Sequence, residues 1–111
     1  MDRRDHQALE DIVAVLDRGL DFPIPDFQTL RRTTYLQDAV IRCLEVLGEA
    51  TKRLSSEIRL VNPSVPWRAM AGMRDVLIHA YDQIDLEEVW VAYQRFSEIR
   101  SLVAAILAQD E

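Results

Sequence analysis

The chain has 111 residues, a length typical of one domain; 49% of them are hydrophobic and 29% are charged. This composition fits a folded globular protein and excludes a disordered or fibrous chain. The net charge of −6 argues against nucleic-acid binding over the whole surface, so an RNA substrate would need local positive charge or a partner that supplies it.

Only three glycines and four prolines occur, which leaves little material for the turns of an all-β fold and favours long helices. The charged start MDRRDHQALED lacks the apolar stretch of a signal peptide, and no run approaches the ~18 apolar residues of a membrane span. A lone Cys43 excludes an internal disulfide, and no Cys/His cluster suggests zinc. We expect a cytoplasmic protein without metal or cofactor, with residues 1–111 as a single domain.

The first predicted helix runs from about Arg4 to Leu20, because its apolar residues recur at helical spacing: Leu9, Ile12, Val13, Leu16 and Leu20. Before it, the mixed charges of residues 2–6 suggest a frayed end with a solvated His6. After it, DFPIPDF at residues 21–27 contains two prolines that cannot continue a helix.

The second predicted helix starts between Asp26 and Arg32 and continues to about Val61. Its main apolar stripe has steps of three and four, with one gap filled by Thr51: Leu36, Val40, Leu44, Leu47, Leu54, Ile58 and Val61. A second stripe of smaller residues lies beside it: Ala39, Cys43, Val46 and Ala50. Gly48 costs such a helix about 1 kcal/mol relative to alanine, and close packing of another backbone would explain its presence.

The breaker NPSVP at residues 62–66 precedes a short helical turn at Trp67 to Ala71 and then a helix over residues 73–82. A last helix opens with Asp85 as its N-cap and with Glu87 and Glu88 in its first turn, where carboxylates suit the helix dipole. The sequence therefore predicts an all-α, up-and-down bundle of four to five helices.

Polar residues gather on one side of the helix predicted over residues 73–82. With Arg74 at zero on a wheel of ~100° per residue, Tyr81 returns to within ~20° of it. Asp75, His79 and Asp82 cluster at roughly 80–140°, and the apolar side chains lie opposite: Met73, Val76, Leu77 and Ala80. These polar residues are expected to share a face that does not point into the core.

This polar face has the groups that RNA cleavage without a metal requires. The imidazole of His79 can move a proton to or from the 2′-hydroxyl or the leaving oxygen, and Asp75, one turn earlier, can orient it. The guanidinium of Arg74 can stabilise charge that accumulates on the phosphate. Such residues also occur together by chance on solvated helices, so their spacing alone does not establish a site.

The pattern of Arg74, four residues, His79, one residue and Tyr81 resembles the signature of the HepT-like branch of the HEPN superfamily. Supporting matches are LGEATKRLS at residues 47–55, VPWRAMAGMRD at residues 65–75 and the VW of residues 89 and 90. The resemblance covers most of the chain from about residue 36 onward.

The resemblance implies a four- to five-helix bundle that forms a homodimer whose two motifs face a shared cleft. It implies a metal-independent endoribonuclease that acts on RNA, not DNA, as the toxin of a bacterial or archaeal toxin–antitoxin pair. Arg74 and His79 would be catalytic, with Asp75 as a polar assistant. An MntA-like nucleotidyltransferase antitoxin would silence the toxin by transferring AMP from ATP to Tyr81, which would add bulk and phosphate charge inside the cleft.

Other candidates have both functional and structural interpretations. Several cations could give the cleft local positive charge or could form a solvated helix face: Arg31, Arg32, Lys52, Arg53 and Arg59. Glu49 is interpreted as structural or cleft-supporting. Trp67 and Trp90 are more consistent with core anchors than with base stacking, and Cys43 with packing.

Two further functions remain open from the sequence. A non-catalytic subunit that pairs with a nucleotidyltransferase is favoured by the acidic charge and by Ala80, where relatives often have Asp or Asn. The extra carboxylate of Asp82 also makes the electrostatic potential more negative in a cleft that should receive phosphate. A purely structural dimer would explain the apolar stripes but would leave the polar face without a purpose.

Overall fold

A computed structural model describes residues 1–79 and 84–110, and for residues 75–79 it describes the backbone alone. Over these residues the chain forms helices and no strand, which confirms the all-α prediction. The helices are α1 (Arg3–Leu20), α2 (Phe27–Arg32), α3 (Thr34–Lys52), α4 (Ser56–Leu60), α5 (Trp67–His79), α6 (Leu86–Gln94) and α7 (Phe96–Gln109).

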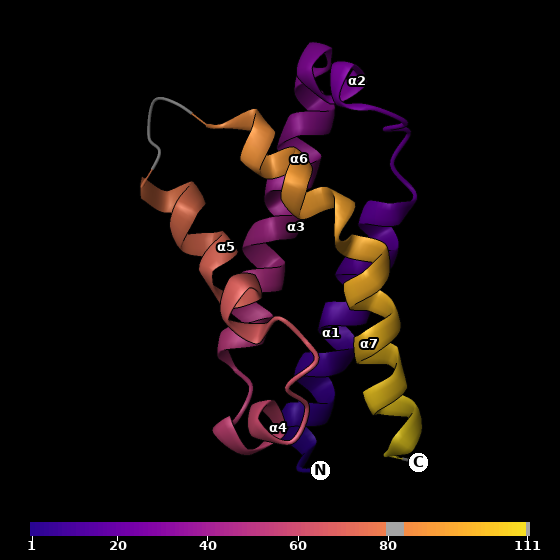
Figure 1. The fold of residues 1–111 in the computed structure, drawn as a ribbon, viewed down its shortest axis with the longest axis vertical. Helices are drawn as coiled ribbons and strands as arrows, with labels where there is room; N and C mark the ends of the chain where they lie inside the picture. Colours follow the sequence, from indigo (N-terminus) through magenta and orange to yellow (C-terminus); the bar gives the residue numbers. More distant parts are fainter. Residues whose placement is uncertain (80–83, 111) are drawn as a thin grey trace.

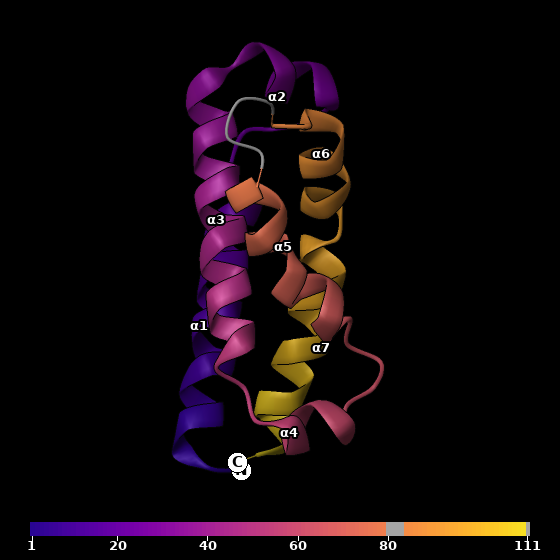
Figure 2. The ribbon, with the colours of Figure 1, turned by 90° about the vertical axis from the view of Figure 1, so that its left-hand side faces the viewer.

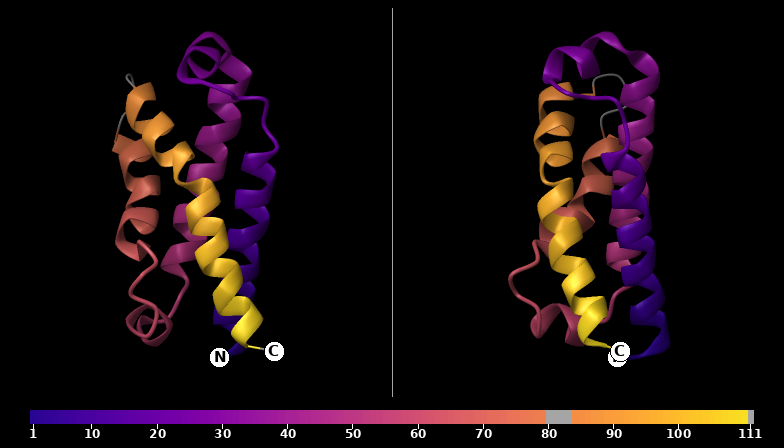
Figure 3. Two further views of the ribbon diagram at one scale, coloured as in Figure 1. Left: turned by 45° about the vertical axis from the view of Figure 1, so that its right-hand side comes forward. Right: turned by 90° about the vertical axis from the view of Figure 1, so that its right-hand side faces the viewer.

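The helices alternate in direction along a molecule of 42 × 27 × 20 Å. Figure 1 shows α1 rising from the end that holds both termini, α3 returning, α5 rising again and α6–α7 descending to the C-terminus. The short α2 crosses the far end and α4 closes the near end, and the turned views agree (Figures 2 and 3). The most extensive contact joins α3 and α5, followed by the contacts of α1 with α3 and α7.

The core lies between these long helices. Its largest fully buried side chains come from every long helix: Leu9, Ile12, Leu16, Leu47, Met70, Phe96 and Ile99. Each such side chain contributes about 1.5–3 kcal/mol by leaving water. The predicted stripe of α1 is confirmed except at Leu20, which is exposed. At this end of α1, Gly19 rather than Leu20 faces the Phe96 ring.

The prediction of one continuous second helix is wrong, since this region forms α2, α3 and α4. Thr33 has an extended backbone (φ −123°, ψ 97°) that ends α2 and begins α3. Ser55 begins α4 and its hydroxyl accepts a hydrogen bond from the Ile58 N–H at 3.4 Å. Arg59 then donates to the Thr51 carbonyl at 2.7 Å, which satisfies an acceptor left free at the end of α3.

The later helices also differ from the predicted boundaries. Residues 67–79 form the single helix α5 instead of a short turn followed by a second helix. Asp85 is confirmed as an N-cap, since its carboxylate accepts from the Glu87 N–H at 3.0 Å. The last helix is interrupted at Arg95, and beyond this bend Phe96 is fully buried. Just before it, the Tyr93 hydroxyl donates to the Gly19 carbonyl at 2.6 Å.

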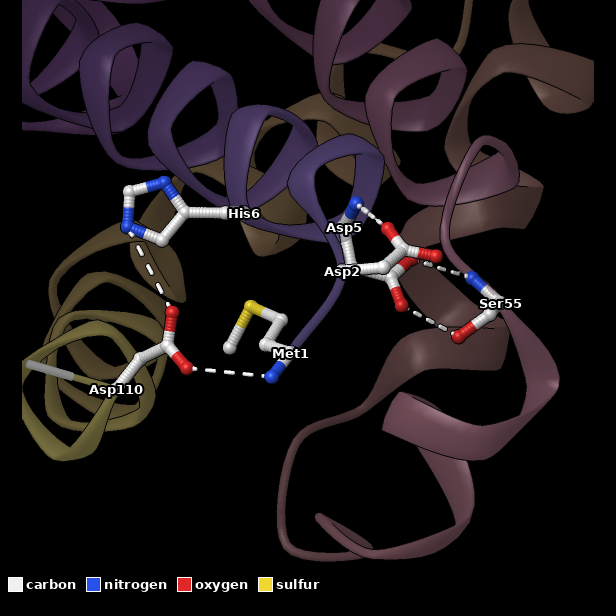
Figure 4. Close-up of polar contacts among 6 residues, drawn as sticks. All are labelled: Met1, Asp2, Asp5, His6, Ser55 and Asp110. Atoms are coloured by element: carbon white, nitrogen blue, oxygen red, sulfur yellow. Dashed lines mark hydrogen bonds and ion pairs between the residues drawn. The ribbon is translucent and has the colours of Figure 1, made fainter.

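The start of α1 is fixed, contrary to the prediction of a frayed end. The Asp2 carboxylate caps α1 by accepting from the Asp5 N–H at 2.8 Å. Asp5 is only 6% exposed, and its carboxylate accepts from the N–H (2.8 Å) and the hydroxyl (2.6 Å) of Ser55, as Figure 4 shows. His6 lies 2.9 Å from Glu10 and 3.9 Å from Asp110. These contacts tie the beginning of α1 to the segment before α4 and to the end of α7.

None of the helices in the described part of the chain is both long enough and apolar enough to cross a lipid bilayer.

Candidate functional site

The candidate site begins where α5 crosses α3 at Gly48. A Cβ atom added to this buried glycine would lie 2.7 Å from the Arg74 Cβ, 3.0 Å from the Arg74 backbone N and 3.4 Å from the Ala71 carbonyl oxygen. Any side chain at Gly48 would therefore push α5 away from α3. The close backbone approach inferred from the sequence is confirmed, and its partner is the helix turn that carries Arg74.

Arg74 is thus held at the contact between two helices and not on a fully solvated face. Its Nε lies 3.6 Å from Glu49 Oε1, on the residue that follows Gly48. The side chains keep 40% and 50% of their exposure, so solvent screens their attraction and the pair contributes little to stability. Since a guanidinium has five N–H donors, the contact with Glu49 leaves donors for a further anion.

The remaining predicted site residues are placed only in part. Asp75 and His79 belong to α5, directly after and five residues after Arg74, and the backbone is helical through both. Tyr81, Ala80 and Asp82 lie outside the described residues. The structure therefore brings Arg74 together with Glu49, whereas the grouping of Arg74, Asp75, His79 and Tyr81 rests on the sequence.

The cations that could either supply positive charge to the cleft or form a solvated helix face have different surroundings in the structure. Arg59 caps the end of α3, as described above, so it is structural. Arg53 pairs with Asp11 of α1 at 2.9 Å, which directs it toward α1. Arg31 and Arg32 are exposed at the end of α2, at the far end of the bundle in Figure 1.

The aromatic and thiol candidates are packing residues. Trp67 is 6% exposed and donates its indole N–H to the Asn62 carbonyl at 2.9 Å. Trp90 packs against Phe27 and Tyr93 at ring-centre distances of 6.3 and 6.2 Å. Cys43 is buried, and this burial raises the pKa of its thiol, which opposes formation of a nucleophilic thiolate.

No group of three or more histidine, cysteine or acidic side chains in the described part of the chain is arranged to hold a metal ion.

Comparison with known proteins places the chain in a family. The model of the family described as "Ribonuclease HepT-like" matches residues 7–106. The chain is 41% identical over 92 residues to a "putative RNase" of Methanocaldococcus jannaschii, covering 81% of this chain and 79% of that protein. It is 38% identical over 94 residues to the "probable ribonuclease HepT" of Thermococcus cleftensis, covering 81% and 83% of the two chains.

A second RNase-named protein of M. jannaschii is 39% identical over 114 residues, covering all of this chain and 94% of that protein. Among solved structures, none is significantly similar to the chain. The resemblance read from Arg74, His79 and Tyr81 is therefore confirmed, and so is the ribonuclease expectation, at the level of the family. The chain belongs to the HepT-like ribonuclease family.

Proposed function

We propose that this ribonuclease is a metal-independent endoribonuclease and the toxin of a toxin–antitoxin pair. The observation that carries the proposal is the placement of Arg74, whose stem is fixed over Gly48 while its guanidinium stays partly exposed beside Glu49. A cation held in this way can meet a phosphate without a large loss of side-chain entropy on binding. Family membership supports RNA as the substrate.

In the proposed reaction, the imidazole of His79 accepts the proton of the 2′-hydroxyl while the 2′-oxygen attacks the adjacent phosphorus. The bond from phosphorus to the 5′-oxygen breaks, that oxygen takes up a proton from water as it leaves, and the imidazolium of His79 returns its proton to the solvent. The guanidinium of Arg74 stabilises the negative charge on the non-bridging oxygens in the transition state. The products are a 2′,3′-cyclic phosphate and a 5′-hydroxyl end, and Asp75 assists by orienting the imidazole.

We further propose that the protein is a cytoplasmic homodimer and that an MntA-like nucleotidyltransferase antitoxin silences it by transferring AMP to the Tyr81 hydroxyl. Tyr81 lies seven positions after Arg74, close to two helical turns, so continued helix would put both on one line. AMP on Tyr81 would then add a phosphate beside the cation that binds the substrate. Light scattering of the purified protein should give the mass of a dimer.

Cleavage of RNA by the purified protein in the presence of EDTA tests the proposed activity. His79→Ala should abolish cleavage while the circular dichroism spectrum and thermal midpoint stay unchanged. Product ends should be 2′,3′-cyclic phosphates, as mass spectrometry of the fragments would show. Undiminished cleavage by His79→Ala would remove this residue from the mechanism, and loss of cleavage in EDTA that added Mg²⁺ restores would contradict metal independence.

The alternative is a non-catalytic subunit that pairs with a nucleotidyltransferase, and the net charge of −6 favours it. Intact-mass measurement after incubation with the nucleotidyltransferase and ATP would show whether Tyr81 gains AMP, with Tyr81→Phe as the control. Since both functions allow this modification, RNA cleavage by the unmodified protein decides between them.

A further inference from the structure

An open hollow of about 420 Å³ at the beginning of α1 is lined by three arginines and a glutamine: Arg3, Arg4, Gln7 and Arg53. We call these four residues the arginine surface. All four side chains are exposed. Their charge of three cations is opposite in sign to the chain as a whole, which carries −6. This is the kind of local positive charge that an acidic protein needs to hold a polyanion.

The carboxylate of Asp11 holds the arginine surface in shape and neutralises one of its three cations, Arg53. Asp11 accepts from the Gln7 side-chain amide at 3.0 Å through one oxygen and from Arg53 at 2.9 Å through the other. Both oxygens of Asp11 are therefore engaged in orienting groups at the hollow. Within residues 1–79 and 84–110, neither Arg3 nor Arg4 is paired with a carboxylate.

The backbone that carries Arg3 and Arg4 is equally well fixed. Asp2 caps this first turn of α1, and the buried Asp5 anchors it to Ser55, fifty residues away (Figure 4). The two arginines therefore project from an ordered turn. They also precede residue 7, where the match to the family model begins.

The last turn of α3 links the arginine surface to the candidate site. Arg53, the C-cap of α3, follows Glu49 by four residues, so the backbones of the two residues lie about one turn apart, about 6 Å along the helix axis. Glu49 pairs with Arg74, and Arg53 lines the hollow. A strand with one phosphate at Arg74 would have to cross the last turn of α3 to place a later phosphate at Arg53 and in the hollow beside α1.

We propose that the arginine surface binds backbone phosphates of the RNA strand next to the phosphate at Arg74. Guanidinium groups suit this role because their paired N–H donors match the geometry of phosphate oxygens. The hollow would anchor the strand without reading its bases, since phosphate contacts carry no sequence information. This proposal rests on the proposed ribonuclease function and adds to it where the substrate strand lies.

The test compares two doubly substituted proteins that lose the same charge. Arg3→Gln/Arg4→Gln removes two cations of the arginine surface, and Arg31→Gln/Arg32→Gln removes two adjacent exposed arginines from the far end of the bundle. The probe is a fluorescein-labelled single-stranded RNA with 2′-O-methyl groups, which lacks the nucleophilic hydroxyl and cannot be cleaved. Anisotropy titrations over a range of KCl concentrations give the affinity and its salt dependence.

Arg3→Gln/Arg4→Gln should weaken RNA binding about tenfold and reduce the slope of log affinity against log salt by about 1.4, the value for two lost phosphate contacts on a single strand. With cleavable RNA, KM should rise by a similar factor while kcat is unchanged, because these contacts are equal in the ground and transition states. In the Arg31→Gln/Arg32→Gln control, the slope of log affinity against log salt and KM should both change much less than in Arg3→Gln/Arg4→Gln.

An equal loss of RNA affinity in both doubly substituted proteins would show a general effect of charge and would overturn the proposal. Unchanged affinity and slope in Arg3→Gln/Arg4→Gln would also overturn it and would leave the arginine surface for an acidic protein partner. If the unsubstituted protein cleaves RNA, either result contradicts only the RNA-binding role of the arginine surface and leaves the ribonuclease function standing. If the unsubstituted protein neither binds nor cleaves RNA, the proposed function itself fails.

Discussion

Two arginine-bearing regions of the molecule are fixed by opposite means. At the contact of α3 with α5, a missing side chain at Gly48 lets the backbone around Arg74 come close. At the start of α1, hydrogen bonds fix the backbone, because the buried carboxylate of Asp5 accepts two hydrogen bonds from Ser55. The comparison shows that close packing positions the proposed catalytic cation, whereas hydrogen bonding orders the surface proposed to hold the strand.

Removal of the buried carboxylate should have the largest effect on stability. Asp5→Ala leaves the Ser55 N–H and hydroxyl without their acceptor, at a cost of about 2–3 kcal/mol in the free energy of unfolding. Asp2→Ala is the matched control, since it removes only the cap of α1 and should cost about 1 kcal/mol. Urea unfolding of both variants measures the difference. Similar losses would mean that the Asp5–Ser55 contact does not anchor this end.

The packing at Gly48 can be broken without altering any charge. Gly48→Ala should lower the free energy of unfolding by about 1–2 kcal/mol, because the clash with Arg74 outweighs the helix propensity gained. It should also slow RNA cleavage, since α5 must shift. Gly72→Ala, on α5 itself, meets no atom within 4 Å and should instead stabilise the protein by about 0.5–1 kcal/mol. Stabilisation by both alanines would contradict the close contact.

The Glu49–Arg74 pair should matter for orientation and hardly for stability. Glu49→Gln should reduce kcat/KM for RNA about three- to tenfold, because the guanidinium loses its fixed direction. Its free energy of unfolding should change by less than about 1 kcal/mol, as expected for an exposed pair. Glu45→Gln is the control one turn earlier, where the carboxylate pairs with Arg42 at 3.3 Å. Faster cleavage by Glu49→Gln would show that its charge merely repels RNA.

A smaller effect on the free energy of unfolding should appear at alkaline pH, and it comes from two residues outside both arginine-bearing regions. Burial raises the pKa of the Cys43 thiol above 9.0 and that of the Tyr93 hydroxyl above 10.0. Both groups ionise first in the unfolded chain, so their contribution to stability is complete below these ordinary values and is lost as pH rises toward the folded values. Urea unfolding between about pH 9 and pH 11 should show this decline, and Cys43→Ala/Tyr93→Phe should flatten it.

The local features of the fold could be predicted from the sequence. The N-cap at Asp85 and the close approach at Gly48 depend on the identity of single residues, and both are confirmed. The interruptions of the long helices could not be predicted in this way. Ser55 begins α4 while bonded to Asp5, fifty residues earlier, and the bend at Arg95 adjoins Tyr93, whose hydroxyl reaches Gly19. Such long-range contacts leave no periodic signal.

The candidate site could be predicted as a motif but not as a place in the fold. The spacing of Arg74, His79 and Tyr81 indicates a family, which the comparisons confirm. A helical wheel places Arg74 on a face away from the core, yet the base of its side chain contacts α3, because a wheel describes one helix and not its neighbour. The ion pair with Glu49 joins residues on two helices, so their spacing in sequence could not reveal it.

The central claim is that the contact of α3 with α5 presents Arg74 to the scissile phosphate. The most direct measurement is the single-turnover rate of RNA cleavage in EDTA by Arg74→Ala, compared with Arg68→Ala, which removes an exposed arginine from the same helix. We predict a loss of about 100-fold or more for Arg74→Ala, as for removal of a group that stabilises transition-state charge, and less than about twofold for Arg68→Ala. Equal rates for the two variants, with both proteins folded, would contradict the assignment of Arg74.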